Sequence, residues 1–235
     1  MVAPPQPPDA ARLPAWLRPE HQRLNASLAL GMVASLASRG AIRDEADARR
    51  AALGATAWPA RFEQLDGVGR LRGARLLLDV AHNEPAVAAL LASVSAAFPA
   101  ARLAVIYGAN GDKDVAAMVR LIARLPRLAQ AVAVQSSHPK AVPPGEVVAA
   151  AREAAAAAPA AAATEQVAWC AAASMAEALE LAAAPLQGEA GAVVVCCGSV
   201  FVAADMRAEV ARADPALFPP TDWVFEEGGE PPLLM

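Results

Sequence analysis

The stretch LLLDVAHNE at residues 76–84 places three side chains with chemical potential directly after an apolar run. Asp79, His82 and Asn83 follow three leucines within five residues. A carboxylate at the tip of a buried strand can accept hydrogen bonds from the hydroxyls of a ribose or orient a cationic partner. Asn83 can cap a helix that begins at Glu84. A lone histidine is more often a structural hydrogen-bonding residue than a catalyst, so both a structural and a catalytic role remain open for His82.

The stretch GANGDKD at residues 108–114 has some features of a phosphate-binding loop. Such a loop needs a lysine directly after its second glycine and then a serine or threonine, whereas here Asp112 intervenes. The glycines instead permit a tight turn, Asp112 can cap the following helix, and Lys113 offers a movable positive charge. The nucleotide fingerprint G-x-G-x-x-G does not occur in the sequence.

Polar or small residues also follow two other apolar runs. Ser136, His138 and Lys140 come after one run, and Gly198 with Ser199 comes after another. For any single residue of this set, ordinary loop polarity explains the pattern as well as a ligand does. Their shared position after apolar runs favours one common site.

Short apolar runs alternate with alanine-rich stretches after residue 57, which is typical of a mostly parallel sheet with helices on both faces. The predicted strands are residues 75–80, 102–108, 131–135, 166–170 and 192–197, and the predicted helices begin near Glu84, Asp112, Pro144, Ala172 and Ala203. Residues 61–73 could add an extended arm that turns at Asp66 and Gly67. In such an α/β sheet the ligand crevice lies at the carboxyl ends of the strands, so the polar residues above should meet there.

Ahead of the sheet the sequence predicts a helix over residues 19–40 and a second helix over residues 44–53. Residues Leu24, Leu28, Met32 and Leu36 recur every fourth position, and Gly40 provides a stop. Two helices alone offer little core, so this segment is interpreted as part of something larger. The predicted organisation is a disordered lead-in (1–18), a helical remnant (19–56), an α/β domain (57–212) and a proline-rich acidic tail (213–235).

Composition excludes several classes of function. The 235 residues are 56% hydrophobic and carry a formal net charge of −4, so the chain can bury a core but lacks the basic field that attracts nucleic acid. Its three cysteines show neither a closed disulfide framework nor metal-binding spacing, and Cys196 and Cys197 are predicted to lie in the core. No apolar run is long enough to span a membrane, and no secretory signal is present. We therefore expect a soluble protein that is not secreted.

Six short motifs follow one another within residues 19–210: HQRLNASLAL, WPARFE, LLLDVAHN, YGANGDKD, SSHPKA and VVVCCGSVFVAADM. Taken together, they resemble the C-terminal third of the folylpolyglutamate synthase and dihydrofolate synthase family of the Mur ligase superfamily. The resemblance implies a Rossmann-like C-terminal domain, preceded by a short helical remnant of a central ATPase domain. It also implies an ATP-dependent ligase of folate biosynthesis, which joins L-glutamate to a pteroate or folate through an acyl phosphate.

The resemblance further implies roles for individual residues. Asn25, Arg61 and Asp79 would contact ATP, and His82 and Lys113 would lie at the catalytic centre. The glutamate and folate side of the site would include Ser136, His138 and Lys140. The sequence departs from the family at Lys140, where arginine is frequent, and at Glu84, where proline is usual.

One family element does not occur in this sequence. There is no G-x-x-G-K-[ST] phosphate loop, and no acidic or histidine cluster suited to Mg²⁺ precedes residue 19. Phosphoryl transfer depends on such positioning, so we expect the chain to be inactive alone and to need a separate ATPase domain, with ATP and Mg²⁺ in the complete enzyme. It could be a fragment, a truncated gene model or a separately encoded half.

Two other classes remain open from the sequence. One is a non-catalytic nucleotide- or folate-binding module derived from the family, and the other is an unrelated flavodoxin-like domain. The expected compartment is the cytoplasm, or a mitochondrion or plastid. The sequence does not separate dihydrofolate synthase from folylpolyglutamate synthase activity, because pterin selection depends largely on other domains of the family.

Overall fold

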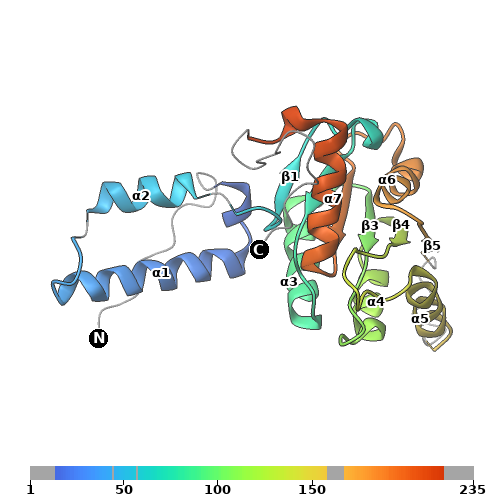
Figure 1. Cartoon of the computed structure of the whole chain (residues 1–235), viewed down its shortest axis with the longest axis horizontal. Coiled ribbons are helices and arrows are strands. Elements are labelled where there is room, and N and C mark those ends of the chain that lie inside the picture. Colours follow the sequence, from blue (N-terminus) through green and yellow to red (C-terminus); the bar gives the residue numbers. More distant parts are fainter. Residues whose placement is uncertain (1–13, 44, 57, 158–166, 220–235) are drawn as a thin grey trace. The chain divides into compact units, whose positions relative to one another are not determined.

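The computed structural model describes residues 14–43, 45–56, 58–157 and 167–219 (Figure 1). The chain divides into two compact units, Met1–Glu63 and Gln64–Met235. Much of the predicted lead-in and tail lies outside the described residues. The domain limits and the ATPase origin of residues 19–56 stay predictions.

The first unit contains the helices predicted ahead of the sheet. A short 3-10 helix, η2 (Ala15–Leu17), precedes α1 (Glu20–Ser38), and α2 (Ala46–Ala55) follows. Gly40 adopts a left-handed conformation with φ +71°. A glycine in this conformation commonly terminates a helix, and α1 ends where the sequence predicts a stop.

The apolar side chains spaced by fours on α1 are exposed. Their exposed fractions are 60% for Leu24, 67% for Leu28, 63% for Met32 and 46% for Leu36. Residues four apart share one helical face, and we call these four residues the α1 stripe. The predicted helical period is thus present, and the stripe is exposed in the described part of the first unit.

Within the described residues, the second unit is built on a six-stranded sheet with the order β1-β2-β6-β3-β4-β5. The strands are β1 (Glu63–Leu65), β2 (Arg75–Leu78), β3 (Leu103–Tyr107), β4 (Leu128–Ala133), β5 (Trp169–Ala171) and β6 (Val193–Cys197). All pairings from β2 through β5 are parallel. The predicted apolar runs supply these strands, and the prediction of a mostly parallel α/β sheet is confirmed. β1 forms the arm predicted from residues 61–73, and Gly67 turns the chain after it with φ +82°.

Helices cover both faces of this sheet (Figure 1). They are α3 (Glu84–Ala97), α4 (Val115–Ala123), α5 (Pro144–Ala156), α6 (Met175–Ala183) and α7 (Val200–Ala213), with the 3-10 helices η3 (Gly69–Leu71), η5 (Ala184–Leu186) and η6 (Pro215–Leu217). The chain runs through β2, β3, β4 and β5 in one direction and then returns to β6. Right-handed crossovers therefore place α3, α4 and α5 on one face and α6 on the other. Contacts of α4 with both α3 and α5, and of α6 with α7, agree with this arrangement.

The strand β6 lies at the centre of the core, with all five residues buried. Cys196 and Cys197 are fully buried, as predicted, and burial raises the pKa of both thiols. The neighbouring Tyr107 is also fully buried, and burial raises the pKa of its phenol. Its ring meets the edge of the Trp169 ring at a centroid distance of 6.2 Å, which is a favourable aromatic geometry.

Among the described residues, no helix combines the length and apolar character needed to cross a membrane.

Candidate functional site

The polar residues predicted from the strand ends gather at the carboxyl edge of the second unit's sheet. β2 connects through α3 to β3, but β6 lies between these two strands. The strand order therefore changes direction beside β6, and ligands of open α/β sheets bind outside such a switch point.

Two glycines bring the loops after β3 and β6 into close contact at this point. Gly198 has φ +108°, and a Cβ atom there would lie 2.3 Å from the Gly108 carbonyl oxygen and 2.6 Å from the Tyr107 ring. A Cβ atom on Gly108 would lie 2.3 Å from the Val134 carbonyl oxygen. The Gly198 N–H also donates to the Ala81 carbonyl at 2.8 Å. Close contacts that only glycine permits thus join the ends of β6, β3 and β4, and a backbone hydrogen bond joins the end of β6 to the tip of β2.

The D-V-A-H-N segment forms the tip of β2, and Asp79 is its buried anchor. Asp79 is 5% exposed, and its Oδ1 accepts a 2.8 Å hydrogen bond from the Ala81 N–H. Burial of the Cys197 thiol raises its pKa, and the nearby charge of Asp79 raises that pKa further. The carboxylate is therefore held in a fixed position at the switch point.

His82 lies on the exposed side of the same tip. Its Nδ1 lies 3.0 Å from the Val80 carbonyl oxygen. A carbonyl oxygen can only accept, so Nδ1 carries a proton and donates, and in the neutral ring Nε2 keeps its lone pair. His82 thus presents a hydrogen-bond acceptor and proton acceptor to solvent. Asn83 caps α3 as predicted, since its Oδ1 accepts from the Ala86 N–H at 3.0 Å.

The loop after β3 differs from the prediction in its helix cap. The cap of α4 is Asp114, whose Oδ1 accepts from the Ala117 N–H at 2.8 Å. Asp112 is not the cap, because α4 begins at Val115 and an N-cap must directly precede the first helical residue. Asp112 instead pairs with Lys113 at 2.8 Å, and the hydrogen bond from this ammonium lowers the pKa of the Asp112 carboxyl.

The loop after β4 carries the three residues predicted to bind substrate. Ser136 is 7% exposed, His138 is half-buried and Lys140 is exposed. The loop is joined to the preceding one, because the Gly111 N–H donates to the Lys140 carbonyl at 2.9 Å. Ser136 and Lys113 are therefore on loops that the backbone holds side by side.

Two buried oxygen atoms in these joined loops have no hydrogen-bond partner among the described residues. They are the Asn110 Oδ1 and the Ser136 Oγ. Buried polar atoms are nearly always hydrogen-bonded, so both are suited to contact a ligand or an ordered water. Asn110 was not among the site residues predicted from the sequence.

Asp205 and Phe201 on α7 were also missed from the sequence. Asp205 accepts two hydrogen bonds from Ser137, and the centroids of the Phe201 and His138 rings are 4.3 Å apart. The available signal was the cap residue Ser199, whose Oγ accepts from the Phe201 N–H at 3.2 Å and starts α7 at Val200 rather than near Ala203. A helix that starts at Val200 places residues 201 and 205 on one face.

Asn25 and Arg61 belong to the first unit. The Asn25 Nδ2 donates to the Gln22 Oε1 at 3.3 Å, and the Arg61 guanidinium lies 5.8 Å from the centre of the Trp58 ring. Their predicted contact with the same ATP as Asp79 stays a prediction.

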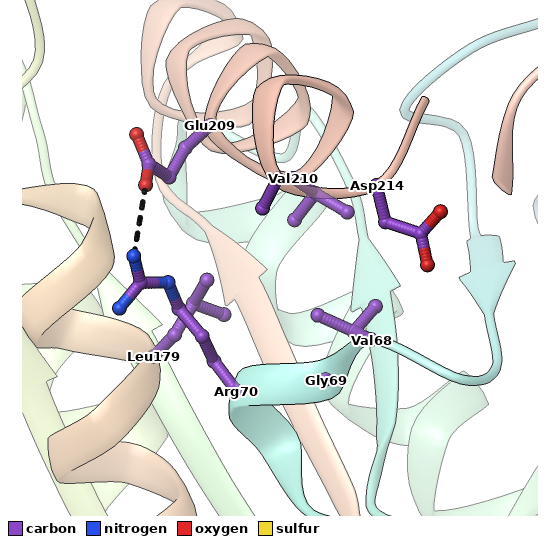
Figure 2. Close-up of a pocket in the computed structure, with 8 residues that line it drawn as sticks. Val68, Gly69, Arg70, Leu179, Glu209, Val210 and Asp214 are labelled. Carbon is purple, nitrogen blue, oxygen red and sulfur yellow. Dashed lines mark ion pairs between the residues drawn. The ribbon is translucent and has the colours of Figure 1, made fainter. Parts of the chain in front are cut away.

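A pocket of about 270 Å³ lies away from these loops (Figure 2). Its walls include Val68 and Arg70, which precede β2, and Val210 and Asp214 at the end of α7. Arg70 pairs there with Glu209 at 3.9 Å. These residues flank the amino ends of the strands, and none of the predicted site residues lines this pocket.

Comparisons with known proteins show a family match and similar solved structures for the α/β domain described above. The family model for the Mur ligase, glutamate ligase domain matches residues 60–200. The structure of Mycobacterium tuberculosis folylpolyglutamate synthase, complexed with ADP and AMPPCP, is similar with 27% identity and a TM-score of 0.65. The similarity covers 82% of this chain and 40% of that one.

Two more distant structures share the fold. Folylpolyglutamate synthase from Thermotoga maritima is 19% identical with a TM-score of 0.58, over 83% of this chain and 39% of that one. The bifunctional folylpolyglutamate synthase/dihydrofolate synthase from Yersinia pestis, complexed with AMPPNP and an Mn ion, is 20% identical with a TM-score of 0.60, over 86% and 40%. No curated protein sequence matches this chain significantly.

The chain therefore spans about 40% of the length of the solved structures that it matches. The family match extends over more than half of the chain and includes the loops at the carboxyl edge of the sheet. The chain belongs to the Mur ligase family, and residues 60–200 are its glutamate ligase domain.

Proposed function

We propose that this chain supplies the C-terminal part of an ATP-dependent ligase of folate metabolism. The reaction joins L-glutamate to the carboxylate of a dihydropteroate or folate, which is first activated as an acyl phosphate. The family match and the 27% identity to the M. tuberculosis folylpolyglutamate synthase support this proposal.

The observation that carries the proposal is the fixed D-V-A-H-N tip at the switch point of the sheet. Asp79 is buried and held by the Ala81 N–H, while His82 is exposed beside it. In the proposed enzyme Asp79 contacts ATP, together with Asn25 and Arg61 of the first unit. A fixed carboxylate suits this role because it can accept hydrogen bonds from ribose hydroxyls without reorganising.

The two proposed catalytic side chains have complementary chemistry. The amine of glutamate must lose a proton as it attacks the acyl phosphate, and the Nε2 lone pair of neutral His82 can accept a hydrogen bond from that amine or its proton. The Lys113 ammonium, now paired with exposed Asp112, can stabilise negative charge on the phosphate. Ser136, His138 and Lys140 would position glutamate or the folate tail.

The residues in the described part of the chain do not fit a magnesium site. No group of three or more His, Cys, Asp or Glu side chains that could hold one occurs in the described part of the chain. In our proposal the Mg²⁺ that accompanies ATP is held by an ATPase domain with a phosphate loop.

The same proposal assigns a role to the α1 stripe. Four exposed apolar side chains on one helical face are suited to contact another protein surface. We assign that surface to the ATPase domain, and we expect the chain to have no ligase activity without it.

A chimaera tests this function. Residues 64–235 of this chain would replace the matching domain of the M. tuberculosis enzyme, and ATP-dependent incorporation of labelled glutamate into a folate would be measured. We expect incorporation by the chimaera, none by this chain alone, and a strong reduction by Asp79→Ala with a raised requirement for ATP. A folded chimaera without incorporation would contradict the proposal.

Titration calorimetry on the full chain separates the main alternative. Tight folate binding by the isolated chain would favour a non-catalytic binding module, whereas the ligase proposal expects weak binding of folate in the absence of the ATPase domain. ATP, ADP and L-glutamate would be titrated in parallel.

A further inference from the structure

The loop after β4 is attached to α7 by one carboxylate. The Asp205 Oδ2 accepts from the Ser137 N–H at 2.6 Å, and the Oδ1 accepts from the Ser137 hydroxyl at 3.0 Å. Both carboxylate oxygens are thus engaged by a single residue of the loop. Hydrogen bonds to an ionised acceptor are stronger than those between neutral groups, so this contact is suited to fix the loop.

A second contact one helical turn away holds the next residue of the loop. The ring of His138 lies against that of Phe201, with a centroid distance of 4.3 Å and an interplanar angle of 38°. Phe201 and Asp205 share one face of α7, because residues four apart are neighbours on a helix. Consecutive loop residues, 137 and 138, therefore rest on consecutive turns of one helix.

The loop backbone then determines which nitrogen of His138 carries the proton. The Lys140 N–H donates to the His138 Nδ1 at 3.1 Å. A ring nitrogen that accepts this bond has no proton, so the neutral ring carries its proton on Nε2. His138 is held as an Nε2–H donor, which is the opposite tautomer to that of His82.

The two histidines lie on different sides of the switch point. They follow β2 and β4, which are three strand positions apart in the sheet. At a strand spacing of about 4.8 Å, this separation is roughly 14 Å. The site thus offers a hydrogen-bond acceptor at one side and a donor at the other.

We propose that Asp205 is a positioning residue that holds His138 as an Nε2–H donor for a carboxylate oxygen of the acidic amino-acid substrate. The ligand assignment rests on the proposed ligase function, whereas the positioning of His138 does not. Exposed Lys140, two residues along the same loop, adds a positive charge that favours an anionic ligand. Asp205 acts only through Ser137 and the loop.

Imidazole ¹H–¹⁵N spectra of the full chain test the positioning directly. The chain has three histidines, so His138→Gln identifies the His138 signals. At a pH at which the ring is neutral, we expect the Nε2–H tautomer in the wild type. Asp205→Ala should give a mixture of both tautomers, because the loop and its Lys140 N–H are no longer fixed. Unchanged His138 signals in Asp205→Ala would overturn the proposal.

Two further variants control this measurement. Glu209→Gln alters a carboxylate on the same helix that pairs with Arg70 and Arg212 rather than with the loop, so it should leave the His138 spectrum unchanged. Ser137→Ala removes the hydroxyl but keeps the backbone N–H, so it should cause a smaller change than Asp205→Ala. If Glu209→Gln perturbs His138 as much as Asp205→Ala does, a specific role of Asp205 is excluded. Ser137→Ala also keeps the test decisive if Asp205→Ala fails to fold.

Titration of the same samples with L-glutamate tests the ligand. We expect glutamate to shift the His138 signals of the wild type, with an apparent Kd about twofold or more higher in Asp205→Ala, because only a fraction of the molecules then present the Nε2–H donor. A Kd unchanged by Asp205→Ala would overturn the ligand assignment. Absence of any glutamate-induced shift, with the tautomer change as expected, would contradict the substrate but leave the positioning role supported. An inactive chimaera would instead contradict the ligase function.

Discussion

Gly198 lies where the loops after β3 and β6 come closest, and it has two separate reasons to be glycine. Its φ of +108° disfavours any side chain, and a Cβ atom would also meet the Gly108 carbonyl oxygen at 2.3 Å. Gly73, elsewhere in the same unit, shows the effect of a positive φ without a steric clash. Gly73 has φ +101°, but a Cβ atom there would meet nothing within 4 Å.

We therefore predict that Gly198→Ala is more destabilising than Gly73→Ala. Gly73→Ala should cost about 1–2 kcal/mol from backbone strain alone, and Gly198→Ala about 2–4 kcal/mol because a steric clash is added. Urea denaturation followed by circular dichroism would measure both. Equal losses of stability in the two variants would show that the contact between the loops after β3 and β6 is not tightly packed.

The buried thiols predict a pH dependence of stability. Burial raises the pKa of Cys196 and Cys197 above the ordinary value of 9.0. Above that pH the thiols ionise in the unfolded chain but stay protonated in the folded one, so the unfolded state binds fewer protons and the free energy of unfolding falls. Each thiol should contribute a fall of about 1.4 kcal/mol per pH unit.

The measurement is the free energy of unfolding at several values of pH between about 8 and 10.5. The double variant Cys196→Ala and Cys197→Ala should show a shallower fall above pH 9 than the wild type. Cys170→Ala is the control, because this thiol is only partly buried, and it should keep most of the fall. Parallel curves for the wild type and the double variant would be inconsistent with the raised pKa values.

At the scale of elements, two aspartates near the start of α4 have different roles, which the sequence alone does not distinguish. Asp114 accepts from the Ala117 N–H, whereas Asp112 pairs with Lys113 in solvent. The first interaction satisfies a backbone donor of the helix, while the second is an exposed ion pair of small net value.

Asp114→Ala should therefore lower the free energy of unfolding by about 1 kcal/mol. Asp112→Ala should change it by less than about 0.5 kcal/mol, and Asp114→Asn should retain most of the cap. Chemical denaturation with unchanged m-values would check all three variants. A larger loss for Asp112→Ala than for Asp114→Ala would place the cap at the residue that the sequence first indicated.

At the scale of the whole molecule, apolar side chains serve two different purposes. Leu77 in β2 is fully buried, whereas Leu28 in the α1 stripe is 67% exposed. The first contributes to the core of the sheet, and the second is available to another surface.

The same substitution should thus have different effects at the two positions. Leu77→Ala should cost about 2–5 kcal/mol of stability, and Leu28→Ala less than about 0.5 kcal/mol. Replacing both Leu24 and Leu28 by Gln should also leave the free energy of unfolding nearly unchanged, since both side chains are exposed. If Leu28→Ala destabilises the fold as Leu77→Ala does, the stripe is part of the core.

Much of the fold and part of the site can be predicted from the sequence, because the signals are local. The period of apolar residues separates helices from strands, and polar residues directly after strands indicate the edge where ligands bind. The Asn83 cap and the buried positions of Cys196 and Cys197 followed from such patterns and are present in the structure. The order of six motifs indicated the ligase family, and the family match to residues 60–200 confirms it.

Tertiary structure decided which of these residues meet. The insertion of β6 between β2 and β3 brings Gly198 against Gly108, and the fold joins Ser137 to Asp205 across 68 residues of chain. A contact between residues so far apart leaves no periodic signal in a single sequence, because it depends on how packed helices and strands approach one another. The sequence alone thus determined the elements, the edge of the sheet and the family. Only the folded chain determined the switch point, the helix cap of α4 and the carboxylate that holds the loop of His138.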